Sequence, residues 1–170
     1  MTLSIGEKII YPSHGPCLIG AVVKKLVGGK STSFYRLAPL DESGGELFIP
    51  VDKIKGLGLR QLVRRSEIPK LLGRLSQEPE TAVLPTTARN WKQRTMDNSK
   101  LLASGSAFDL AEVVESLTGL NEKRGLASQD RQTLDRAKKL LVCEIAEVLG
   151  ETKSAAAEQV DKALQVRKPG

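Results

Sequence analysis

The sequence predicts an α+β protein of two domains, a small antiparallel β domain followed by an all-α bundle of about five helices. Short β-rich runs separated by Gly and Pro turns fill the chain up to about residue 63. After that point, apolar residues recur with the helical period instead. A length of 170 residues is enough for two small domains. We therefore expect domains over residues 1–63 and 64–170.

The strands expected in the first domain are short. Apolar runs over 9–11 and 18–23 flank the turn PSHGP, residues 32–40 alternate in polarity, and 47–51 follow DESGGE. The glycine pairs at 28–29 and 44–45 lack the following helix and lysine of a phosphate-binding loop, so we interpret them as hairpin turns. This pattern is typical of a small antiparallel barrel or curled sheet.

Helical periodicity and end signals predict the elements of the second domain. Ser66 is expected to cap a helix over 66–76, and residues 77–87, with Pro79 and Pro85, read as a loop. A further helix is expected to begin between 87 and 90 and to end near Gly105. The remaining helices are expected over 108–120, over 128–150 with Ser128 as cap and Gly150 as stop, and over 152–166.

Composition limits the functions that the chain can have. Its net charge of +6 favours polyanionic partners, although weakly. The sequence has neither an apolar run of membrane length nor a signal peptide, so we expect a cytoplasmic protein that does not bind membranes. Cys17 and Cys143 lie far apart in apolar surroundings and are expected to be buried, unpaired fillers.

The sequence offers little for catalysis. His14, the only histidine, lies in a turn, where it is expected to bond local backbone rather than act as a base. Acidic residues such as Asp41, Glu42, Glu112 and Glu115 are interpreted as solvated. No metal-ligand spacing is present, so we expect a binding protein with no catalytic residue, cofactor or metal.

Trp91, the only tryptophan, lies in the basic stretch ARNWKQRT at an expected helix start. Its helical stripe continues through Thr95, Asn98 and Leu102 and is polar in the middle, which argues against full burial. Two interpretations remain open. Trp91 packs one face against the helical core, or it is an exposed aromatic wedge for nucleic acid, with neighbouring cations on phosphates near the unpaired amides of the first turn.

Two groups of segments together resemble the CarD/CdnL family of bacterial regulators that bind RNA polymerase. IGEKIIYPSHGPCLIGAV and FIPVDKIKGLGLR resemble the family's N-terminal domain. NWKQR, KLLASGSAFDLAEVVESL, EKRGL and DRAKKLLVCEIAEVL resemble its helical domain, in the same order and at similar spacing. Each motif is short, so their shared order along nearly the whole chain carries the specificity.

The resemblance implies a Tudor/SH3-like β domain that docks on the β subunit of RNA polymerase by extending a sheet. It also implies a helical domain that holds promoter DNA at the upstream edge of the transcription bubble, with a tryptophan wedged in the minor groove. The residues implied for DNA binding are Trp91, Arg94, Lys92, Arg89 and Arg124, and those for polymerase binding are Lys25, Phe48 and Arg36.

The chain departs from the family pattern at several of these positions. Gln93 and Thr95 replace a cation and an aromatic, Leu120 aligns with a basic residue, and Phe48 stands where some members have arginine. Fewer phosphate contacts predict weaker, less salt-dependent DNA binding. We expect a monomeric, nucleoid-associated regulator with little base-specific readout. The alternative is an adaptor that binds polymerase or a repair factor without touching DNA.

Overall fold

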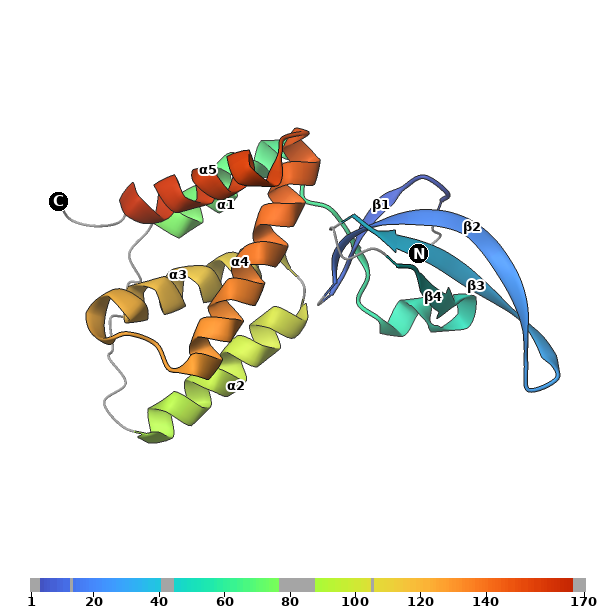
Figure 1. The fold of residues 1–170 in the computed structure, drawn as a ribbon, viewed down its shortest axis with the longest axis horizontal. Helices are drawn as coiled ribbons and strands as arrows, with labels where there is room; N and C mark the ends of the chain where they lie inside the picture. The colour runs from blue at the N-terminus through green and yellow to red at the C-terminus, as the bar shows by residue number, and fades with distance from the viewer. Residues whose placement is uncertain (1–3, 13, 41–44, 77–87, 105, 167–170) are drawn as a thin grey trace. The chain divides into compact units, whose positions relative to one another are not determined.

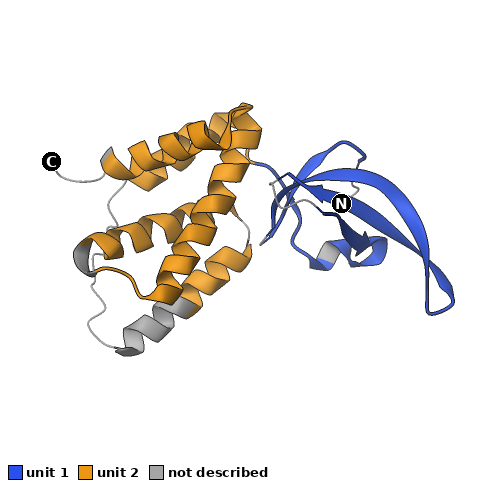
Figure 2. Ribbon diagram, viewed as in Figure 1, with its two compact units in different colours: residues 1–62 blue, residues 63–170 orange. Residues whose placement is uncertain are grey.

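A computed structural model describes residues 4–12, 14–40, 45–76, 88–104 and 106–166, without the side chains of residues 55, 88–95, 123, 124 and 166. The chain divides into two compact units, residues 1–62 and 63–170 (Figure 2). The first unit is built on an antiparallel sheet and the second from α-helices, so the predicted two-domain α+β class is confirmed (Figure 1).

The first unit is a five-stranded antiparallel sheet in the order β4-β3-β2-β1-β5. Its strands are β1 (Lys8–Tyr11), β2 (Gly15–Val27), β3 (Lys30–Pro39), β4 (Leu47–Pro50) and β5 (Arg60–Gln61). A 3-10 helix, η1 (Val51–Gly56), connects β4 to the segment before β5. The short β4 and β5 are the two terminal strands of the sheet.

The β2–β3 hairpin is longer than the sequence indicates. Its turn is the predicted Gly28-Gly29 pair, with φ of 59° and 81°. Positive φ at both central residues is what a two-residue hairpin turn matching strand twist requires. Strand β2 continues beyond the expected Val23 to Val27, and Lys24 to Val27 are all exposed. Because both faces of this part are solvated, it lacks the alternating polarity that marks a half-buried strand.

One face of the sheet covers the core of the first unit. The buried residues are Ile9, Cys17, Ile19, Leu37, Ile49, Ile54 and Leu59. Cys17 is buried, as expected. His14 lies in the turn before β2, where its backbone N–H donates to the Tyr11 carbonyl at 2.9 Å and its Nδ1 lies 3.5 Å from the Pro12 carbonyl oxygen. The predicted local role of His14 is confirmed.

The second unit contains five described α-helices: α1 (Ile68–Ser76), α2 (Ala88–Ser104), α3 (Ala107–Arg124), α4 (Ser128–Leu149) and α5 (Lys153–Val166), preceded by the 3-10 turn η2 (Arg65–Glu67). Gly150 ends α4 in the left-handed conformation, as predicted. The two predicted serine caps are wrong. Ser66 lies inside η2, where the Arg64 N–H donates to Glu67 Oε1 instead, and Ala127 rather than Ser128 occupies the cap position of α4.

The helical core is formed by α1, α3, α4 and α5, with α2 packed beside α3 and α4. Its fully buried side chains include Leu71, Leu75, Leu117, Leu141 and Ile145. Cys143 is also buried, as expected. Of the acidic residues predicted to be solvated, Glu112 is exposed, whereas Asp41 and Glu42 lie outside the described residues. Gly44, predicted in a hairpin turn, and Gly105, predicted at a helix end, also lie outside them. Within the described ranges, no helix is long and apolar enough to cross a membrane.

Candidate functional site

The sheet brings the three residues predicted to bind polymerase onto one face. Arg36 of β3 and Phe48 of β4 are direct cross-strand partners. Lys25 of β2 places its Nζ 3.7 Å from the centroid of the Phe48 ring. Their strand neighbours Tyr35 and Ile49 contribute to the core instead. Since successive residues of a strand point to opposite faces, the predicted residues share the face away from the core.

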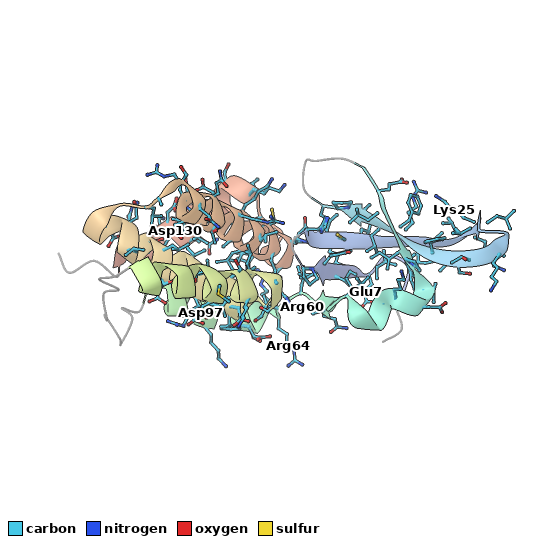
Figure 3. The ribbon with its side chains drawn as sticks, turned by 90° about the horizontal axis from the view of Figure 1, so that it is seen from below. Glu7, Lys25, Arg60, Arg64, Asp97 and Asp130 are labelled. Atoms are coloured by element: carbon cyan, nitrogen blue, oxygen red, sulfur yellow. The ribbon has the colours of Figure 1, made fainter. Side chains whose placement is uncertain are left out.

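We call Val23, Lys25, Phe34, Arg36 and Phe48 the outer-face cluster. Val23 pairs with Phe34, which extends the cluster along the same face. Phe48 is 40% exposed, a large fraction for an aromatic side chain. Arg36 forms an ion pair with Glu46, so its charge is partly balanced. The ammonium group of Lys25 lies over the Phe48 ring, and Figure 3 labels Lys25 in the sheet unit. An aromatic with an adjacent cation suits a protein surface that presents both apolar and acidic groups.

The outer-face cluster reaches the end of the sheet. Strand β4, which carries Phe48, is the terminal strand, and no described strand pairs with its other edge. Such an edge can accept a strand from a partner through main-chain hydrogen bonds. Large apolar side chains are also exposed on this unit: Ile5, Val22, Leu26, Val27, Phe48 and Val51. The outer-face cluster and the free edge together form a surface suited to protein binding.

Helix α2 carries Trp91 in its first turn, as predicted, since the helix begins at Ala88. The side chains of Arg89, Trp91, Lys92 and Arg94 lie outside the described ones. Asn98, two turns further along, is only 5% exposed. The inference that a polar residue here marks a solvated stripe is therefore wrong, because this part of the stripe lies against the bundle.

The exposed side of α2 can be located from its described residues. Met96 is 56% exposed and Lys100 is also exposed. At 100° per residue, positions 89 and 92 project to the same side as Met96, whereas positions 91 and 94 project with Asn98. The predicted DNA-binding positions of α2 thus fall into two groups on the helical wheel, 89 and 92 on one side and 91 and 94 on the other. Arg124 ends α3, and its side chain lies outside the described ones.

Leu120 explains one departure from the family pattern. It is 8% exposed and packs in the helical core. A charged side chain at this position would have to leave the core to reach phosphate, because burying an unpaired charge is costly. In this chain the position therefore contributes apolar packing, and any phosphate contact must come from other residues.

Among the described residues of the helical unit, three acidic residues are buried: Glu115, Asp130 and Glu144. The prediction that Glu115 is solvated is wrong, since its Oε2 accepts a hydrogen bond from Arg74 Nη1 at 2.7 Å. The Val63 N–H donates to Glu144 Oε2 at 2.8 Å. Residues 63–170 contain 18 Lys and Arg against 15 Asp and Glu. Burial of three carboxylates makes the surface of the unit more basic than its composition indicates.

The buried acids were missed in the sequence although it carries signals for them. Glu144 stands in the apolar run LLVCEIA, where α4 is buried continuously from Leu141 to Ala146. Glu115 has the small residues Ala111 and Gly119 four positions before and after it, both buried. Small residues at this spacing permit close helix packing, which removes the side chain between them from water.

Comparison with known proteins identifies a family for each of the two units. The model of the CarD-like/TRCF RID domain matches residues 3–63, and the model of the CarD C-terminal domain matches residues 74–161. A Bacillus subtilis (strain 168) protein named "Putative transcription factor YdeB" is 26% identical over 148 residues, which cover 87% of this chain and 93% of that protein.

The two matched domains coincide with the sheet unit and with most of the helical unit. The described residues contain no group of three or more His, Cys, Asp or Glu that could hold a metal ion. The matches identify a transcription-related regulator rather than a member of an enzyme family. The chain belongs to the CarD family of transcription regulators.

Proposed function

We propose that the protein binds the β subunit of RNA polymerase through its sheet unit and promoter DNA through its helical unit. The single observation that carries the proposal is the outer-face cluster, with Lys25, Phe48 and Arg36 on one face beside the free edge of β4. Strand addition at this edge supplies main-chain hydrogen bonds, and the cluster supplies side-chain specificity. The matched CarD-like/TRCF RID domain supports this partner.

The proposed DNA contact lies at the upstream edge of the transcription bubble. Trp91 acts there as a minor-groove wedge, with Arg89, Lys92, Arg94 and Arg124 near phosphates. An apolar wedge placed at an unstacked base step resists reclosure of the duplex. The contacts carry little base-specific readout, because phosphate contacts position a protein without reading sequence. In a cell, the protein would then act in the cytoplasm on the nucleoid.

The proposal is tested by the lifetime of open complexes on one promoter, measured after a competitor challenge with and without the protein. The wild-type protein is expected to lengthen the lifetime about tenfold, which corresponds to about 1.4 kcal/mol of stabilisation. Raising the salt concentration should reduce this gain, because phosphate contacts release counterions. An unchanged lifetime at saturating protein would contradict the proposed function.

The Lys25→Glu variant is expected to weaken binding to the polymerase β subunit about tenfold. It reverses a charge and removes the cation from the Phe48 ring. Lys24→Glu is the matched control, because Lys24 is exposed on the same strand but points to the opposite face. Interferometry with immobilised β subunit measures both. Equal losses for the two variants would show that total charge, rather than the outer-face cluster, governs binding.

A second candidate function is favoured by the burial of Asn98. If Trp91 packs against the bundle as Asn98 does, the helices serve as a scaffold and the protein is an adaptor on polymerase or a repair factor. The fluorescence of Trp91, the only tryptophan, discriminates the two functions. A blue-shifted, quencher-shielded emission supports the adaptor, and a red-shifted emission that changes with forked DNA supports the wedge.

A further inference from the structure

The segment that connects the two units is held at its sheet end by Gln61. This residue pairs with Ile9 in the sheet. Its side-chain amide donates to Glu7 Oε1 at 3.3 Å, and its carbonyl accepts a hydrogen bond from Arg60 Nη1 at 3.0 Å. Backbone and side chain therefore both fix Gln61 within the first unit.

The segment is held at its helical end by Val63 and Arg64. The Val63 N–H donates to Glu144 Oε2 at 2.8 Å, and the Val63 side chain packs against the helical core. The Arg64 N–H donates to Glu67 Oε1 at 3.1 Å, and the Glu67 N–H returns a bond to the Arg64 carbonyl at 2.9 Å. Arg60 belongs to the first unit and Arg64 to the second, and both are labelled in Figure 3.

The Glu144 side chain is fully buried, at 1% exposed. A buried carboxylate is tolerated when donors satisfy it, and a backbone N–H bonded to a carboxylate is stronger than one bonded to a neutral acceptor. Glu144 and Val63 are 81 residues apart in sequence, so this contact serves tertiary position rather than local helix structure. An apolar residue in its place would pack as well but would leave the Val63 N–H without this acceptor.

We infer that Glu144 is a positioning residue that reduces the connection between the units to a pivot of one residue, Leu62. Gln61 is fixed in one unit and Val63 in the other, so only the backbone torsions around Leu62 remain free. This inference deepens the proposed function and rests on it in one respect, the binding of both units to the same open complex. A short tether keeps the second unit at a high effective concentration near its site once the first unit is bound, and a longer tether lowers that concentration.

The pivot is tested first in the free protein, without polymerase or DNA. Hydrogen exchange of the Val63 amide is expected to accelerate about tenfold or more in Glu144→Ala, because its acceptor is lost. Glu144→Gln keeps a side-chain oxygen and should restore most of the protection. Glu158→Gln, an exposed acid on α5, is the matched control and should leave Val63 unchanged.

Nuclear magnetic relaxation measures the motion of one unit relative to the other. It therefore distinguishes a positioning role of Glu144 from a role in the stability of the bundle alone. The difference between the rotational correlation times of the two units is expected to increase relative to the wild type in Glu144→Ala and in a variant with four Gly-Ser residues inserted after Leu62, but not in Glu144→Gln. The insertion leaves both units intact, so it keeps the test valid if Glu144→Ala unfolds the bundle. Unchanged Val63 exchange in a folded Glu144→Ala, or correlation times in the insertion variant equal to those of the wild type, would overturn the inference.

The functional arm measures open-complex lifetime with the same proteins. The insertion variant is expected to retain binding to the β subunit and to forked DNA separately, while its gain in lifetime falls several-fold. If the wild type gives no gain, the proposed function fails, and the exchange and relaxation results still decide the pivot. If the insertion variant gives the same open-complex lifetime as the wild type, the pivot does not couple polymerase binding to DNA binding.

Discussion

The Trp91→Ala variant is expected to lose most of the roughly tenfold gain in the lifetime of promoter open complexes that the wild-type protein gives. The roughly 1 to 3 kcal/mol that an aromatic side chain contributes when it stacks on a base is large enough to account for the whole of this gain. The loss should fall mainly on the open state, because the unstacked base step at the edge of the bubble admits the ring without the cost of unstacking a closed duplex. Binding to the β subunit should be unchanged, since Trp91 lies in the helical unit.

Met96→Ala is the matched control for Trp91→Ala. Met96 is an exposed apolar residue of the same helix, five positions further along. Its truncation removes apolar surface from α2 but no aromatic ring, so the open-complex lifetime should stay near that of the wild type. Trp91→Phe should retain part of the effect, because a smaller ring still stacks. Equal lifetimes for wild type and Trp91→Ala would remove Trp91 from the mechanism.

The architecture could be predicted because each half of the chain carries one clear period. The change from β-rich runs to helical spacing falls near residue 63, and the structure divides between 62 and 63. The glycine pair at 28–29 fixes a hairpin turn by its backbone freedom alone. The outer part of β2 could not be bounded, because its side chains are solvated on both faces and show no alternation.

The candidate site was predictable only where strand register or helix start determines it. Lys25 and Phe48 were separate positions in the sequence, and the sheet register brings them together. The burial of Asn98 was not predictable, because polarity alone does not say which side of a helix packs against the bundle. The partners of Glu115 and Glu144 lie 41 and 81 residues away, beyond any local pattern.

The contact of Arg74 with Glu115 predicts the largest effect on stability. Arg74→Ala is expected to lower the free energy of unfolding by about 3 kcal/mol, the lower end of the range for breaking a buried ion pair. The lower end applies because the Arg74 side chain is 35% exposed, so water partly screens the pair. Urea unfolding followed by circular dichroism measures the change, and an equal m-value confirms that the midpoint reports stability.

The reason for this loss is the carboxylate that remains. Glu115 is 1% exposed within the bundle, so the variant leaves a buried charge without the guanidinium beside it. Removing both groups should therefore cost much less than removing one. Arg74→Met with Glu115→Leu is expected to recover most of the stability, because apolar side chains of similar volume need no ion partner.

The double-mutant cycle separates this cause from simple loss of packing. A coupling free energy of at least about 1 kcal/mol between Arg74 and Glu115 is expected, as for residues in direct contact. Glu112→Ala, an exposed acid on the same helix, should change stability by less than about 0.5 kcal/mol. Strict additivity of Arg74→Met and Glu115→Leu would mean that each side chain stabilises α3 independently. The pair would then not be what holds α1 against α3.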